Sequence, residues 1–426
     1  MNSIEKKTIA QGVSFTSIKE ERFKTARISV TMLLPLNKET APAYSLLPSV
    51  LVYSCNKYPN ALALSRALAN LYGAGVSGSC RKVGEALEIS LVIAGLDDRY
   101  TMNKEKISPD MVNMLCEILF NPKVENGAFA EEDFNQCKRQ LLESIDGEFN
   151  DKRSYAISQM VENMCQNEVF GIKRYGSREA VEALTPQQLY TAWQQLLINS
   201  RVEIMMIGSS DTESAEAVIK EKFASINRTQ PDINTKVIST VDNVKEITEE
   251  SDIAQAKLVM GFRANSKQLF DTPIPMTLTV AILGGTPSSK LFLNVREKLS
   301  LCYYCAARYY KNKDIMIIDS GVESENVEKA IVEIKNQLAY MQKGEISDFE
   351  IDSAKLSTIN RYKTSQDNIK GIESFYTGQF LDKQILTVDE MIQQLNAVTK
   401  EDIVSLAKTI TLDTVYLLKP KEEGQE

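Results

Sequence analysis

The sequence predicts an α+β fold made of two homologous domains, each a mainly antiparallel sheet with helices packed on one face. The chain has 426 residues, which is too many for one ordinary core. Similar motifs recur in its two halves, which indicates an internal duplication. The predicted strands are interleaved with pairs of helices instead of alternating with single helices, a pattern typical of α+β domains.

Each half begins with a strand, a turn and an apolar helix. The runs 26–33 and 257–262 alternate between apolar and other residues, as strands do. An acidic residue, a threonine and a proline follow each run within 39–42 and 271–273, and each leads into an apolar helix. The two halves therefore start with the same order of elements.

The middle of each half contains a strand followed by long helices. The predicted strands are 86–93 and 314–318, and the predicted long helices are 131–148, 154–168, 324–341 and 348–364.

Each half ends with a capped helix and a β-rich run. Thr185 and Thr399 are followed by Gln or acidic residues two and three positions later, as at a helix N-cap. The runs 201–208 and 414–418 then favour strands. We expect domains at 1–228 and 253–426, joined by a polar, acidic linker at 229–252.

Charge and hydropathy exclude several classes of partner. Lys plus Arg number 49 and Asp plus Glu number 57, which gives a net charge of −8. Nucleic-acid binding needs a basic face, and an acidic chain has no general attraction to anionic lipid. No stretch approaches the roughly 20 apolar residues of a membrane helix, and the N-terminus has no apolar signal region. We expect a cytoplasmic protein that neither binds nucleic acid nor inserts into membranes.

The chain contains no histidine, so its own residues can build neither a Ser-His-Asp nor a Cys-His site. Its seven cysteines are scattered, which does not suggest a disulfide framework. Cys302 and Cys305 form a single CxxC that supplies at most two zinc ligands. A redox pair is the alternative, but it favours a helix start, whereas this run predicts a strand. We interpret the cysteines as reduced and packed like small hydrophobic residues.

Two glycine-rich stretches superficially resemble phosphate sites. Residues 73–78 have GxGxxG spacing, but a helix precedes them and a strand follows, the inverse of a dinucleotide fold, which favours a helix C-cap and turn. Residues 284–290 lack phosphate-loop spacing. We interpret them as a turn in which Ser288 or Ser289 caps the helix that carries Arg296.

Arg296 and Tyr303 lie seven residues apart, with Arg296 near a helix end and Tyr303 entering a strand. Together they could present a guanidinium and a phenol to one substrate carbonyl or carboxylate. A surface ion pair and a tyrosine at the edge of the core are the alternatives. Acidic residues are also frequent on the predicted helices, but spacing alone singles out no acid–base pair.

The stretch 284–303 resembles the second-half signature of the insulinase/pitrilysin metallopeptidase family, the inverzincins. It contains a glycine-rich turn, small residues, Leu291-Phe292, Arg296-Glu297 and then Tyr303. The family is built from two homologous halves, so the resemblance covers almost the whole chain and implies a processing-peptidase-like fold. It also implies that Arg296 and Tyr303 help to hold a peptide substrate.

The first half departs from the family's zinc motif, H-x-x-E-H. In this resemblance Ser45 and Ser49 stand at the two histidine positions and Pro48 at the glutamate, while Glu143 matches the distant third ligand. Serine is a poor zinc ligand, proline cannot act as a base, and one carboxylate does not hold zinc. We therefore expect no catalytic residue, no metal and no cofactor.

The resemblance implies a non-catalytic, peptide-binding subunit that pairs with a zinc-bearing homologue in bacterial peptide or protein processing. Family members of this kind work as pairs in which a degenerate subunit supplies the Arg/Tyr contacts. The first alternative is a stand-alone homodimer that binds peptide or protein without hydrolysis. The second is an unrelated enzyme that uses Ser288 or Ser289 activated by Lys290.

Overall fold

A computed structural model describes residues 4–209 and 212–421 and divides the chain into two compact units. The first unit comprises Met1–Asp146, Ile172–Asn234 and Gln366–Phe380. The second comprises Gly147–Gly171, Thr235–Ser365 and Leu381–Glu426. The units thus differ from the expected contiguous halves, because one segment of each half belongs to the unit of the other half.

The first unit is built on a six-stranded sheet in the order β1-β2-β8-β3-β5-β4. All neighbouring strands are antiparallel except β2 and β8, which are parallel. The strands are β1 (Ile4–Ala10), β2 (Val13–Lys19), β3 (Thr25–Pro35), β4 (Gly75–Val83), β5 (Ala86–Leu96) and β8 (Arg201–Gly208). A separate two-stranded ribbon joins β6 (Val124–Glu125) to β7 (Ala128–Phe129).

The second unit repeats this topology in a five-stranded sheet, β11-β12-β10-β13-β9. Its strands correspond in order and pairing sense to β4-β5-β3-β8-β2, including the parallel pair at the end. They are β9 (Lys245–Ser251), β10 (Ala256–Arg263), β11 (Cys302–Tyr310), β12 (Ile315–Val322) and β13 (Thr411–Pro420). The repeated topology is the structural counterpart of the duplicated sequence pattern.

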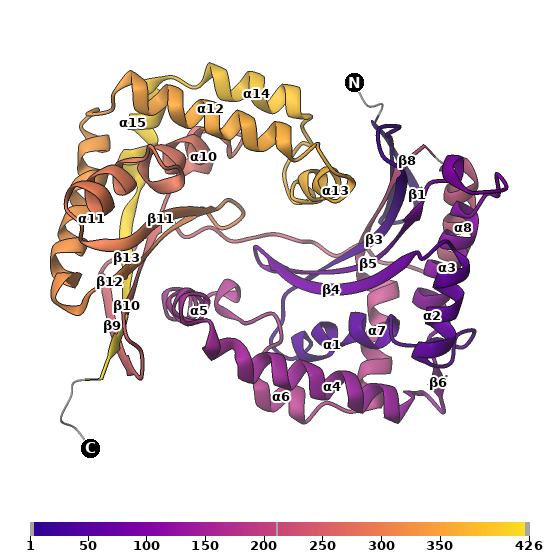
Figure 1. The fold of residues 1–426 in the computed structure, drawn as a ribbon. Helices are drawn as coiled ribbons and strands as arrows, with labels where there is room; N and C mark the ends of the chain where they lie inside the picture. The colour runs from indigo at the N-terminus through magenta and orange to yellow at the C-terminus, as the bar shows by residue number, and fades with distance from the viewer. Residues whose placement is uncertain (1–3, 210–211, 422–426) are drawn as a thin grey trace. The chain divides into compact units, whose positions relative to one another are not determined.

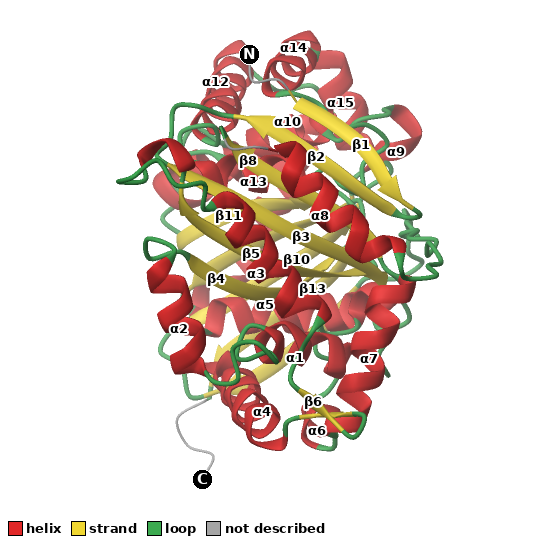
Figure 2. Ribbon diagram, turned by 90° about the vertical axis from the view of Figure 1, so that its right-hand side faces the viewer, coloured by secondary structure: helices red, strands yellow, loops and turns green. Residues whose placement is uncertain are grey.

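Helices cover one face of the first sheet because alternate residues of its strands are apolar. Ile28, Val30 and Met32 of β3 face this main core, and Figure 2 shows α3 and α8 in front of the strands. The helices of the first half in this unit are α1 (Ala41–Leu51), α2 (Ala61–Asn70), α3 (Ser108–Phe120), α4 (Glu131–Asp146), α6 (Arg178–Glu182), α7 (Pro186–Asn199) and α8 (Thr212–Ala224).

The helices of the second half gather on one face of the β9–β13 sheet, as Figure 1 shows for α10, α11, α12, α14 and α15. The bounds are α9 (Ser266–Leu269), α10 (Ile274–Val280), α11 (Val327–Gln342), α12 (Asp348–Thr364), α14 (Val388–Ala397) and α15 (Lys400–Thr409). Two widened helical turns, η4 (Ala281–Gly285) and η5 (Leu291–Lys298), lie between α10 and β11. Thr185 and Thr399 cap α7 and α15 through complete capping boxes, as predicted.

On each sheet, the face opposite the main helical layer is covered by one helix that comes from the other half of the sequence. Helix α5 (Lys152–Met164) packs against Val259 of β10, and Met160 and Met164 fill the space beside Gly261. Helix α13 (Ile369–Thr377) packs on β3 and β8, where Arg27 pairs with Glu373 at 2.6 Å. Both sheets therefore carry a helix on the face opposite their main helical layer, in addition to the single layer predicted.

The expected linker at 229–252 is partly a strand. Lys245–Ser251 forms β9, an edge strand that pairs in parallel with β13, and it belongs to the second unit. Among the residues that the structure describes, no helix combines the length and the apolar character needed to span a bilayer.

Candidate functional site

Helix α1 carries three of the predicted motif positions, and the first of them is fully engaged within the protein. The Ser45 side chain is buried, and its hydroxyl donates a 2.6 Å hydrogen bond to the carbonyl oxygen of Arg174. The neighbouring Cys80 thiol is held protonated, because burial raises its pKa to about 11. Neither group is a free ligand for a cation at neutral pH.

The other motif positions are no better suited to zinc. Pro48 lies inside α1 and offers neither a side-chain donor nor an acceptor. Ser49 is exposed, and Glu143 of α4 is also exposed, with Arg139 of its own helix 3.9 Å away. Within residues 4–209 and 212–421, no cluster of three Cys, Asp or Glu side chains could hold a metal ion. The donor set present does not fit a zinc centre.

Strand β4 lies directly on α1 at the degenerate motif. A Cβ atom on Gly78 would be 2.5 Å from the Pro48 carbonyl oxygen, so only glycine permits this approach. The preceding turn contains Tyr72 and Gly73, both with positive φ, and it ends α2 before β4 begins. The predicted helix end and turn are thus present at the start of the first glycine-rich stretch, whereas residues 75–78 already belong to β4.

The second glycine-rich stretch, residues 284–290, allows the chain to pack closely against neighbouring elements. A Cβ atom on Gly284 would be 2.7 Å from Leu291 and 2.9 Å from Ala307, so the turn is pressed against η5 and β11. The predicted N-cap is wrong: Lys290 occupies the cap position and no side chain caps the helix. Ser288 Oγ lies 3.2 Å from Thr286 Oγ1 instead, and the Ser289 side chain is buried.

Lys290 is unavailable as the base for a serine nucleophile. Its buried ammonium group lies 2.9 Å from Glu350, which also belongs to the capping box of α12. Burial opposes ionisation of Glu350, but hydrogen bonds from the Ser347 backbone and from Lys290 leave the pKa of its carboxyl below the usual value. Glu350 is therefore ionised at neutral pH, and its position beside Lys290 favours a structural role for this contact.

Arg296 and Tyr303 line the same pocket of the second unit. Arg296 projects from η5, its guanidinium 4.6 Å from the centre of the Phe292 ring, and its side chain is 40% exposed. Tyr303 on β11 is 78% exposed. The remaining lining residues are Gln255, Glu297, Ser300, Leu301, Cys302 and Glu323.

The two predicted residues keep their polar groups available for a ligand. The shortest charged contact of Arg296 is 3.7 Å, to Glu297, too long for a hydrogen bond. A guanidinium presents several donors in a fixed fork, and a phenol donates or accepts. Together they can bind a carboxylate or a peptide carbonyl.

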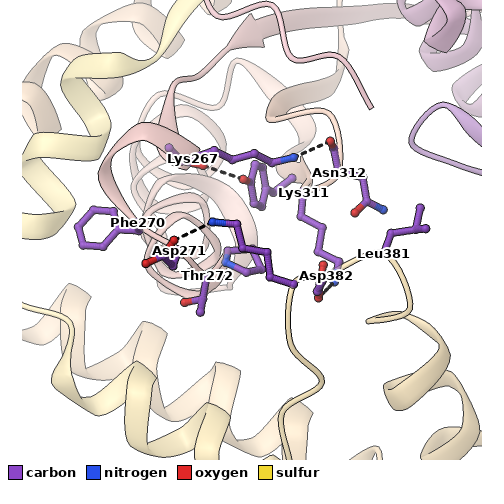
Figure 3. A pocket seen from close by; sticks show the side chains of 12 residues that line it. Lys267, Phe270, Asp271, Thr272, Lys311, Asn312, Leu381 and Asp382 are labelled. Carbon is purple, nitrogen blue, oxygen red and sulfur yellow. Dashed lines mark hydrogen bonds and ion pairs between the residues drawn. The ribbon is translucent and has the colours of Figure 1, made fainter. Parts of the chain in front are cut away.

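A second pocket of the same unit was not anticipated (Figure 3). Its walls come from three separate stretches, 266–273, 309–312 and 381–383. Lys311 pairs with Asp382 at 2.5 Å, Lys383 pairs with Asp271 at 2.8 Å, and Lys267 donates to the Asn312 carbonyl oxygen at 2.8 Å. These internal pairs largely balance the pocket's charges. No local sequence pattern could have brought three such distant stretches together.

Comparison with known proteins supplies relatives for the whole chain. A family model described as "Peptidase M16 inactive domain" matches residues 183–357. The chain is 29% identical to "Probable inactive metalloprotease YmfF" of Bacillus subtilis, over 96% of both chains. It is 22% identical to "Uncharacterized zinc protease YmxG" of the same species, over 84% of this chain and 88% of the relative.

Solved structures show the same fold over the full length. A conserved protein from Enterococcus faecalis superposes with a TM-score of 0.89 at 27% identity, covering 99% of this chain and 100% of that one. A structure from Pseudomonas fluorescens titled as a peptidase M16 inactive domain superposes with a TM-score of 0.77 at 14% identity, covering both chains completely.

Proposed function

This chain is an M16 (insulinase) family peptidase homologue, and from that premise we propose that it is a non-catalytic, peptide-binding subunit that pairs with a zinc-bearing homologue in peptide or protein processing. The observation that carries the proposal is the contrast between its two halves. The α1 positions lack a zinc-binding donor set, whereas Arg296 and Tyr303 line one pocket, in which the charged contact of Arg296 with Glu297, at 3.7 Å, is too long for a hydrogen bond.

The proposed role of the pocket is to hold a peptide, not to cut it. The Arg296 guanidinium would bind a carboxylate or carbonyl oxygen of the peptide, and the Tyr303 phenol would donate to the same region. The aromatic ring of Tyr303 adds apolar contact area at low conformational cost. The zinc ion and the general base for hydrolysis would come from the partner subunit.

The test combines the full chain with a zinc-bearing M16 homologue encoded by the same genome. Light scattering measures the mass of the complex, and a quenched fluorescent peptide reports hydrolysis. We expect a heteromeric complex in which Arg296→Ala lowers kcat/KM by roughly tenfold or more, because hydrogen bonds to charged groups contribute about 1.5–3 kcal/mol. Arg361→Ala is the matched control, since Arg361 is an exposed arginine of α12 outside both pockets described above.

Two other outcomes would count against a paired, non-catalytic subunit, and one of them would favour a stand-alone homodimer. Absence of a complex together with unchanged hydrolysis would remove the proposal. A stable self-dimer that binds peptide and leaves every tested M16 peptidase unaffected would support the stand-alone homodimer instead.

A further inference from the structure

A bulge in β11 places two cysteines on the same face of the strand. Cys302 pairs with Val322, but Tyr304 pairs with Gly321 and Cys305 with Ser320, so Tyr303 is an extra residue. Residues three apart in a regular strand point to opposite faces. The additional residue reverses that relationship, and both thiols lie on the face that carries Ser320 and Val322.

The two thiols differ in access. Cys302 is half-buried and lines the pocket that contains Arg296 and Tyr303. Cys305 is buried, with 5% of its surface exposed. A reagent that enters the pocket therefore reaches Cys302, whereas burial shields Cys305.

The surroundings of Cys302 favour its thiolate. Its hydrogen bond with the Cys305 thiol lowers the pKa of Cys302 to about 7 against the opposing effect of burial, and the positive charge of Arg296 acts in the same direction. The Ser320 hydroxyl also acts to lower the pKa of Cys302. We expect its effect to be small, because its single proton is donated to the Tyr304 carbonyl oxygen at 2.8 Å.

The neighbouring and distant thiols behave differently. The interaction with Cys302, together with burial, raises the pKa of Cys305. Burial raises the pKa of the thiols elsewhere in the chain, at Cys55, Cys80, Cys116, Cys137 and Cys165. Cys302 is thus the thiol best prepared to act as a nucleophile at neutral pH.

We propose that Cys302 is a site of oxidation by hydroperoxides and that Cys305 resolves the product to an intramolecular disulfide. The Cys302 thiolate attacks the terminal peroxide oxygen, the O–O bond breaks, and the departing alkoxide or hydroxide takes up a proton. Cys302 is then a sulfenic acid. The Cys305 sulfur loses its proton and attacks Cys302, the S–O bond breaks, and water leaves. Two thiols and one hydroperoxide yield one disulfide, one alcohol (or water) and one water.

The oxidation is measured on the purified, reduced full chain without peptide or partner. One tryptic peptide, residues 299–308, contains both cysteines, so their state is read by mass spectrometry after alkylation. After hydrogen peroxide treatment we expect this peptide to lose two hydrogens and to take up no alkyl groups. Cys305→Ser should accumulate a sulfenic acid on Cys302 that dimedone traps, and Cys302→Ser should leave Cys305 reduced.

Control measurements separate reactivity from folding. Cys116→Ser should form the same disulfide as the wild type, and circular dichroism verifies that each variant is folded. The alkylation rate of Cys302 should have its midpoint near pH 7, below the value of about 8.5 for an ordinary thiol. Arg296→Ala should move that midpoint upward.

The proposal would be overturned if other cysteines were oxidised before Cys302. It would also be overturned if Cys302 stayed reduced while free glutathione, added as a competing thiol, was consumed by the peroxide. These readouts involve neither peptide nor partner, so their failure is independent of the proposed binding function.

Discussion

The hydroxyl of Ser45, a residue of α1, donates a hydrogen bond to the Arg174 carbonyl oxygen. The sequence resemblance predicted Ser45 at the first histidine position of the zinc motif. This bond satisfies a backbone acceptor next to a buried side chain. The Ser45 side chain therefore has a structural role.

Ser45→Ala should destabilise the protein by about 1–2 kcal/mol, because the Arg174 carbonyl loses its donor. Urea denaturation followed by circular dichroism measures the change. Ser49→Ala, at an exposed position one turn later, should change stability by less than about 0.5 kcal/mol. Equal effects at the two positions would show that the buried hydrogen bond is unimportant.

Gly78→Ala should be more costly, because its new methyl group would meet the Pro48 carbonyl oxygen at 2.5 Å. Relief of this overlap requires β4 or α1 to move, and overpacking of this kind costs typically about 1–3 kcal/mol. Gly75→Ala on the same strand is the matched control, since no atom lies within 4 Å of its added Cβ. A thermal unfolding midpoint that falls equally for both would contradict the predicted packing of β4 on α1.

The strands and caps of this fold were predictable because their signals are local. The alternation in 26–33 and 257–262 gave β3 and β10, and Thr185 and Thr399 gave two helix starts. Each signal depends on residues within one or two turns or on one strand face.

Features that depend on distant partners were missed. Apolar periodicity predicted α5 as a helix, but it could not indicate that α5 packs on the sheet of the second unit. Strand β9 is an edge strand with alternating exposure and few apolar residues, so its sequence resembled a linker. The resemblance directed attention to Arg296 and Tyr303, but the bulge that orients Cys302 and Cys305 has no local signature.

The purified chain should contain well below one zinc ion per molecule. The Ser45, Pro48, Ser49 and Glu143 side chains do not supply three ligands, so metal added during purification should be lost on dialysis. Plasma mass spectrometry measures the zinc content, and EDTA should leave the thermal midpoint unchanged. Stoichiometric zinc that disappears in Glu143→Ala would contradict the assignment of α1 as a degenerate site.

Glu168, which follows α5, should make the stability of the second unit sensitive to acid. It lies 2.6 Å from both Arg263 and Lys313. Burial opposes ionisation of Glu168, but the hydrogen bonds from these two cations bring the pKa of its carboxyl below the ordinary value of 4.5. Because the folded pKa is lowered, the stabilisation is complete above about pH 4.5 and is lost as the pH falls through the folded value.

Glu168→Gln should therefore cost about 3 kcal/mol at pH 7, since it removes the carboxylate that lies 2.6 Å from both the buried Arg263 and the buried Lys313. It should also reduce the loss of stability between pH 6 and pH 3, because the residue that titrates is gone. Urea midpoints across this range measure both effects. Glu246→Gln, at an exposed position of β9, should keep the wild-type pH dependence. If the Glu168 variant kept it too, the acid sensitivity would have to arise from other carboxylates.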